Sequence, residues 1–146
     1  MAECWAYAHG DLGEPHFPDG STVRRPVVTG APVNSAQILL AVVDSGSPIS
    51  VADARLFQRL GIDTERDKPL YDVPLTIGGG DGRIPIYAVE LMLVPPGSIA
   101  GSPVRWGLHL GARTRWHLPF AVLFGQRGWF DRFPTTIDAT TTTVEL

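Results

Sequence analysis

Two short apolar runs, each ending in a turn that contains glycine, restrict the fold of this chain more than any other feature. Residues 38–43, "ILLAVV", lead directly into Asp44, and residues 118–124, "LPFAVLF", lead into Gly125. Apolar runs of about four to eight residues between turns are typical of buried strands, because a buried helix needs a longer run. The first run therefore carries an ionisable aspartate to the end of a buried strand.

The rest of the chain has the same character, with 16 glycines and 13 prolines among 146 residues. Such frequent breaks suit many short strands joined by turns. Residues 25–33 and 37–43 flank the polar pair Asn34-Ser35, which predicts a hairpin. Further strand-like runs cover residues 71–77, 83–94, 104–110, 118–124 and 135–146. We therefore expect an all-β fold, a closed barrel or sandwich, with one or two short helices.

One helix is predicted over residues 51–60, where Ser50 and Asp53 resemble a capping box and Gly61 suits the position after the last turn. Residues 126–133, "QRGWFDRF", could add one or two helical turns.

The domain itself is expected to span residues 23–146. Residues 1–22 are rich in Gly, Pro, His and Asp without a sustained period, so we expect an irregular N-terminal arm, packed through Trp5, Tyr7 and Phe17.

Composition excludes several classes of protein. A hydrophobic content of 44% with 18% charged residues is that of a globular chain, and the net charge of -3 gives no reason to expect nucleic acid or an anionic membrane as partner. Cys4 is the single cysteine, so no internal disulfide can form. The sequence has no signal-peptide pattern and no apolar run near the roughly 20 residues of a membrane helix. A soluble cytoplasmic protein is the expectation.

Cofactor and metal signatures are missing from the sequence. The four histidines, His9, His16, His109 and His117, have no zinc-like spacing with Cys, Asp or Glu. The glycine-rich stretch "IGGGDG" lacks the lysine and following helix of a phosphate loop. No serine lies in a Gly-x-Ser-x-Gly elbow. We expect no cofactor and no metal.

The residues around Asp44 allow two interpretations. Asp44, Ser45 and Gly46 could simply form a turn, since Asp and Ser bond neighbouring amides and Gly supplies a positive φ. Alternatively, a carboxylate delivered by a buried strand is partly desolvated, which makes it usable as an acid or base.

Four segments in order resemble the retropepsin-like aspartic proteases, a retroviral-type family with bacterial single-domain members. "VVDSGSPIS" (42–50) resembles the active-site loop, and "LTIGGGDGRIPIY" (75–87) resembles the flap hairpin. "VLFGQRGWFDRF" (122–133) is similar to the hydrophobic-hydrophobic-Gly element with its short helix, and "TTIDATTTTVEL" (135–146) to the closing strands. The resemblance covers about residues 24–146 and is closest to the bacterial-type members.

The resemblance implies a role for each residue of these segments. Asp44 would be the catalytic carboxylate, supported in its loop by Ser45, Gly46 and Ser47. The flap would consist of Ile77, Gly78, Gly79, Gly80, Asp81 and Gly82 and would close over an extended peptide. The floor and the apolar substrate pockets would involve Ile77, Ile84, Leu123, Phe124 and Gly125.

Two carboxylates that share one proton are needed for this chemistry, because like charges about 3 Å apart cannot both ionise. The chain has one Asp-Ser/Thr-Gly motif, and Asp81 and Asp138 lie in different contexts. The second Asp44 would come from a second copy, so the expected enzyme is a homodimeric aspartic endopeptidase. A retropepsin-fold binding or dimerisation module with weak or no catalysis is the alternative.

Three positions depart from the pattern of the viral members. Their acidic residue two places after the Gly is Pro48 here, and their Arg after the second glycine is Gln126. These two residues tend to pair, so the sequence indicates a lost ion pair. Ser47 stands where viral members usually have Ala. A hydroxyl that donates to the catalytic carboxylate would favour its charged form and give an acidic pH optimum.

Overall fold

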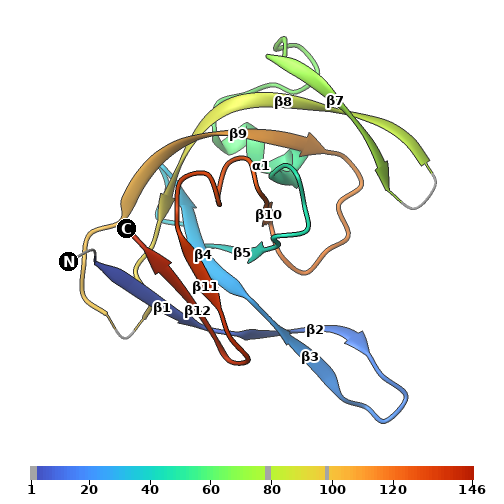
Figure 1. Ribbon diagram of the computed structural model, residues 1–146. Helices are drawn as coiled ribbons and strands as arrows, with labels where there is room; N and C mark the ends of the chain where they lie inside the picture. The colour runs from blue at the N-terminus through green and yellow to red at the C-terminus, as the bar shows by residue number, and fades with distance from the viewer. Residues whose placement is uncertain (1–2, 78–79, 98) are drawn as a thin grey trace.

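The strand-rich pattern of the sequence folds into a barrel with two attached sheets, as the computed structural model shows for residues 3–77, 80–97 and 99–146 (Figure 1). Within these residues the strands are β1 (Cys4–Ala8), β2 (Gly10–His16), β3 (Thr22–Arg25), β4 (Val27–Pro32), β5 (Leu39–Val43), β6 (Val51–Asp53), β7 (Tyr71–Ile77), β8 (Gly80–Leu93), β9 (Val104–Arg113), β10 (Val122–Phe124), β11 (Thr135–Ile137) and β12 (Thr141–Glu145). The helix α1 (Ala54–Arg59) follows β6.

The largest sheet closes on itself. Its strands run in the order β4-β5-β10-β6-β9-β8-β7, and β4 also pairs with β8, which closes the ring and leaves β7 outside it. The pairings β4–β5 and β7–β8 are the two predicted hairpins. Closure removes the free edges within the ring, and β7 is left as the edge strand of this sheet. The all-β expectation is confirmed.

The two apolar runs of the sequence meet inside this barrel. β5 and β10 pair in parallel, with Ala41 opposite Val122 and Val43 opposite Phe124. Because the strands are parallel and in this register, Asp44 and Gly125 leave the barrel side by side. The two apolar runs, each followed by a turn that contains glycine, therefore end next to each other in the fold.

Two apolar clusters lie on opposite faces of the barrel strands. The larger contains a group of aromatic rings, in which Phe124 stacks on Trp129 at 4.8 Å between ring centroids and Trp129 contacts Phe133 at 4.7 Å. The smaller contains Val27, Val42, Val51, Ile84, Ile86, Trp116 and Phe120. Successive side chains of a strand point to opposite faces, so neighbours such as Val42 and Val43 belong to different clusters.

The N-terminal segment is not the irregular arm that the sequence predicted. β1 pairs with β12 along its whole length, and β2 pairs with β3 in a hairpin that extends away from the barrel (Figure 1). Trp5 and Tyr7 alternate with exposed residues, so β1 buries one face, and the Tyr7 hydroxyl donates to the Val94 carbonyl. Packing through Trp5 and Tyr7 is confirmed, whereas Phe17 is 46% exposed.

The helix is shorter than predicted and has a different cap. Residues 51–53 continue as β6, and Asp53 caps α1 by accepting from the Arg55 N–H at 3.0 Å. Ser50 is fully buried and does not cap the helix. Gly61 has a positive φ of 78° directly after the end of the helix, as expected. Residues 126–133 form turns instead of a helix, with one bond of helical spacing from the Phe133 N–H to the Trp129 carbonyl.

Replacing Asp53 by alanine is expected to cost about 1 kcal/mol of unfolding free energy at neutral pH, a usual value for an N-cap. Burial raises the pKa of the Asp53 carboxyl, but the hydrogen bonds and charge of Arg55 outweigh burial and hold that pKa below its usual value. A lowered folded-state pKa stabilises the protein above the unfolded value, about 3.9 for aspartate, and this contribution is lost as the pH falls through the folded-state pKa.

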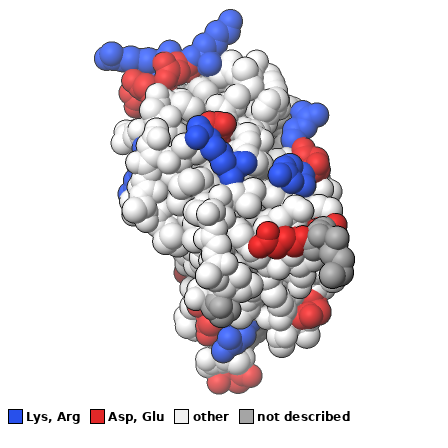
Figure 2. Space-filling view, turned by 90° about the vertical axis from the view of Figure 1, so that its left-hand side faces the viewer, with Lys and Arg blue, Asp and Glu red and all other residues white. Residues whose placement is uncertain are grey.

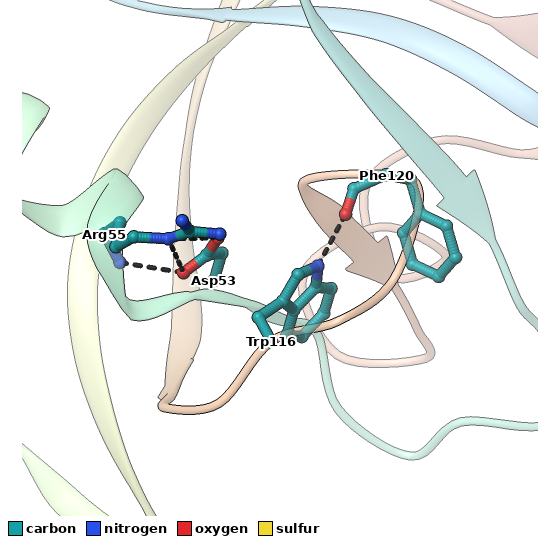
Figure 3. A network of polar contacts seen from close by, with 4 residues as sticks. All are labelled: Asp53, Arg55, Trp116 and Phe120. Atoms are coloured by element: carbon teal, nitrogen blue, oxygen red, sulfur yellow. Dashed lines mark hydrogen bonds and ion pairs between the residues drawn. The ribbon is translucent and has the colours of Figure 1, made fainter.

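Urea unfolding at several pH values measures the difference in unfolding free energy between wild type and Asp53→Ala. This difference should narrow below about pH 4. Arg55→Ala is the matched control. It removes the ion pair seen in Figure 3 but leaves the backbone N–H that Asp53 caps, so its effect should be smaller. An effect of Asp53→Ala that does not change with pH would contradict this account.

The surface carries charges of both signs. On the face turned to the viewer in Figure 2, acidic and basic side chains are interspersed, with wide uncharged areas between them. No helix within the described residues has the length and apolar character required to cross a membrane.

Candidate active site

The loop after β5 folds around the Asp44 side chain. The Asp44 N–H donates to the Phe124 carbonyl at 2.8 Å, which fixes the start of the loop to the end of β10. The Gly46 N–H then turns back to donate to Asp44 Oδ1 at 2.9 Å, and the Ser47 N–H donates to the Asp44 carbonyl at 3.2 Å. Asp44 is exposed, as is its bond with the Gly46 N–H. Asp44 is thus held by its own loop and remains accessible.

The turn after β10 packs directly beneath this loop. The Gln126 N–H donates to the Ser47 carbonyl at 2.8 Å, and the Arg127 N–H donates to the Pro48 carbonyl at 3.1 Å. A Cβ at Gly125 would lie 2.2 Å from the Ile49 carbonyl oxygen. Only glycine allows this approach, which explains why the second apolar run ends in glycine.

Ser50 joins the two loops from below, a role that the sequence did not reveal. Its hydroxyl donates to the Arg127 carbonyl at 2.8 Å and accepts from the Gly125 N–H at 3.0 Å, and the residue is fully buried. A serine between Ile49 and Val51 in a strand-like run is the one signal available, since a buried hydroxyl needs partners.

Gln126 also reaches the active loop through its side chain. Its Nε2 donates to the Ser45 carbonyl at 2.6 Å. In the sequence analysis, Gln126 was notable only because the viral members have an arginine at this position. In the structure the glutamine makes a bond within its own chain.

The hydroxyl of Ser47 does not donate to Asp44, contrary to the sequence-based prediction. It donates to the Ile49 carbonyl at 2.7 Å. A hydroxyl has one proton to give, so it cannot also donate to the carboxylate. The predicted dependence of the pH optimum on Ser47 therefore loses its basis.

A cavity of about 270 Å³ opens beside Asp44. It is lined by Asp44, Gly46, Ser47, Pro48, Ile49, Val51, Arg113, Trp116, Leu118 and Leu123. Most of these side chains are apolar. Among the described residues, Arg113 is the one charged side chain that lines the cavity with Asp44, and no second carboxylate does so.

The floor residues are divided by the pleat of β10. Leu123 lines the cavity, whereas Phe124 next to it is 1% exposed and stacks on Trp129 in the large cluster. Ile84 is buried in the small cluster and does not line the cavity. The expectation that Phe124 lines a substrate pocket is therefore corrected, because adjacent strand residues face opposite sides. The same expectation for Ile84 is corrected for another reason: Ile84 lies on the side of Leu123 but is enclosed within the small cluster.

One wall of the cavity comes from the loop that joins β9 to β10. Trp116 in this loop donates from Nε1 to the Phe120 carbonyl at 2.5 Å, and the two rings meet edge to face (Figure 3). Arg115 has a φ of 57°, a backbone conformation that residues other than glycine rarely adopt. The bond within the loop holds Trp116 in place on the cavity wall.

The predicted flap corresponds to the β7–β8 hairpin, whose register pairs Ile77 with Gly80, Thr76 with Asp81 and Leu75 with Gly82. Gly78 and Gly79 lie outside the described residues. At the base of the hairpin, the Tyr71 hydroxyl bonds His109 Nδ1 at 2.8 Å and accepts from Arg127 Nη1 at 3.3 Å. The hairpin base is thereby tied to the turn beneath the active loop.

Of the two other acidic residues considered in the sequence, Asp81 belongs to the β7–β8 hairpin and Asp138 lies elsewhere. Asp138 is exposed in the turn between β11 and β12, where the backbone N–H groups of Thr140 and Thr141 lower the pKa of its carboxyl. It does not line the Asp44 cavity. No cluster of three or more His, Cys, Asp or Glu side chains that could hold a metal occurs among the described residues.

Comparison with known proteins gives a match in fold. No protein family and no curated protein matches the chain by sequence. Among solved structures, the crystal structure of a retropepsin-like aspartic protease from Rickettsia conorii is similar, with a TM-score of 0.57 and 14% identity, over 99% of this chain and 93% of that chain. The chain therefore has the retropepsin-like all-β fold.

Proposed function

We propose that the protein is an aspartic endopeptidase that acts as a homodimer, with Asp44 of each chain as one half of the catalytic pair. The observation that carries the proposal is the position of Asp44. It lies at the mouth of an apolar cavity, its carboxylate accepts from the Gly46 N–H, and its backbone is fixed to the end of the parallel strand β10. This site stands on a fold shared with a retropepsin-like aspartic protease.

The second carboxylate comes from a second copy. Among the described residues no other acid lines the Asp44 cavity, and Asp138 is placed in the sheet formed by the chain termini. A two-fold axis beside the Asp44 loop brings the same residue from both chains together. Two carboxyl groups in contact hold one proton between them and titrate as a unit.

The reaction follows from this shared proton. The ionised carboxylate takes a proton from water as the water oxygen attacks the scissile carbonyl carbon, and the protonated carboxyl gives its proton to the carbonyl oxygen. As the resulting tetrahedral diol collapses, the C–N bond breaks, the protonated carboxyl gives its proton to the leaving amine, and the other carboxylate takes a proton from one diol hydroxyl, which restores the shared proton. The products are a carboxylic acid and an amine, with one water consumed.

The cavity favours an apolar substrate side chain. Its walls include Ile49, Trp116, Leu118 and Leu123, whose burial by a substrate contributes roughly 25 cal/mol per Å² of apolar surface. An extended peptide can add strand-like hydrogen bonds along the β7–β8 hairpin, which would close over it as a flap.

A non-catalytic dimerisation module is the second candidate. It is favoured by Pro48 and Gln126, which replace an ion pair of the viral members. The bond from Gln126 to Ser45 supports the enzyme instead, because the active loop is braced without that pair.

Cleavage of a mixed peptide library between pH 4 and 7 tests the proposal. The wild-type protein is expected to cut at apolar residues, and Asp44→Asn is expected to reduce cutting to background. A stable dimer that cuts nothing in either form would support the module, and a strict monomer in sedimentation at assay concentration would contradict the enzyme.

A further inference from the structure

One peptide group in the active loop is hydrogen-bonded at both ends. The carbonyl oxygen of Ser45 accepts from Gln126 Nε2 at 2.6 Å. The N–H of Gly46, which belongs to the same peptide group, donates to Asp44 Oδ1 at 2.9 Å. The side-chain amide of Gln126 is therefore linked to the Asp44 carboxylate through a single planar, polarisable unit.

The order of donors and acceptors makes this link directional. A donor at a carbonyl oxygen draws electron density toward that end of the peptide group, which makes the N–H at the other end a stronger donor. Chains of hydrogen bonds reinforce each other in this way by about 10–30% per bond. The receiving group is a carboxylate, for which charge-assisted bonds are the stronger kind.

The backbone holds Gln126 where this link requires it. Its N–H donates to the Ser47 carbonyl, and the preceding Gly125 fits against the Ile49 carbonyl without room for a side chain. The side chain of the next residue, Arg127, is directed to the Tyr71 hydroxyl, so it is not the group that meets Ser45. Gln126 thus brings a neutral donor to the loop and adds no charge near Asp44.

We propose that Gln126 is a positioning residue that orients and polarises the Ser45–Gly46 peptide group, and so strengthens the Gly46 N–H donation that holds the Asp44 carboxylate. This inference rests on the proposed aspartic protease function. Gln126 acts on the active loop of its own chain through a neutral hydrogen bond, whereas an arginine at this position would form an ion pair.

The Gly46 amide resonance of ¹⁵N-labelled full-length protein reports this link without any need for activity. We compare wild type with Gln126→Met, which keeps the bulk of the side chain but loses the donor, and with Gln126→Ala. Gln58→Met is the matched control, since Gln58 is an exposed glutamine on α1. Thermal unfolding checks that each variant is folded.

Both Gln126 variants are expected to move the Gly46 amide proton upfield, because its hydrogen bond weakens. Arg113 is the charged side chain that shares the cavity with Asp44, and it is unchanged in every variant. Gln58→Met should leave the Gly46 amide shift as in wild type.

Peptide cleavage supplies the second readout. Both Gln126 variants should have a lower kcat than wild type with little change in KM, whereas Gln58→Met should change neither. Unchanged Gly46 shifts in the Gln126 variants overturn the inference even where the wild type cleaves peptides. A Gly46 amide proton that moves upfield in the Gln126 variants of a protein that cleaves nothing sustains the inference and removes the proposed function.

Discussion

Mixing wild-type chains with Asp44→Asn chains is expected to inhibit the wild type, because a dimer with one asparagine has only half of the acid pair. If the chains pair at random, the activity per wild-type chain falls to about half at equal amounts and to about one quarter at a threefold excess of the variant. Asparagine matches the size of aspartate, so the Gly46 N–H keeps an oxygen to bond. Peptide cleavage after the mixture has been allowed to exchange subunits measures this dependence.

Asp138→Asn is the matched control for this titration. It makes the same chemical change at an exposed turn between β11 and β12, away from the Asp44 cavity. Mixing it in should leave the activity per wild-type chain unchanged. A constant activity with Asp44→Asn as well would mean that one chain carries a complete site, and the homodimeric mechanism would then be wrong.

Gly125→Ala is expected to be strongly destabilising, because among the glycines whose surroundings the structure describes, Gly125 has the closest contacts for an added Cβ. The new Cβ would lie 2.2 Å from the Ile49 carbonyl oxygen and 2.6 Å from the Ser47 carbonyl oxygen. Both are backbone atoms that cannot rotate away, so the two loops must separate and break the bond from Gln126 to Ser47. We expect a loss of about 3 kcal/mol or more in unfolding free energy, together with loss of cleavage.

Urea denaturation of Gly97→Ala provides the comparison. An added Cβ at Gly97 meets nothing within 4 Å, and its φ is not in the left-handed region. Its stability should stay within about 0.5 kcal/mol of wild type. Equal effects at Gly97 and Gly125 would show that the close approach of the loops is not what requires glycine.

The sequence predicted the barrel where local patterns and long-range contacts agree. The runs before Asp44 and Gly125 are apolar throughout because both faces of β5 and β10 are covered, by the large cluster on one side and the small one on the other. The β7–β8 hairpin was predicted because its strands are neighbours in the chain, joined by a glycine-rich turn.

Features that depend on distant partners were not predicted. β1 looks irregular in sequence because its alternation of Trp5 and Tyr7 with small residues is short, and its partner β12 lies at the other end of the chain. Ser50 was read as a helix cap, since nothing local indicates that its partners are Gly125 and Arg127. The side-chain role of Gln126 likewise needs the fold to bring it to Ser45.

The pairing of β1 with β12 also brings together two residues that a new peptide link could join. The Leu146 N–H donates to the Glu3 carbonyl at 2.8 Å, so Glu3 and Leu146 are neighbours in space. A short peptide bridge between them would turn the chain into a ring with little disturbance of the barrel. Because a ring has fewer unfolded conformations than a linear chain, such a cyclised backbone would gain resistance to unfolding from entropy alone.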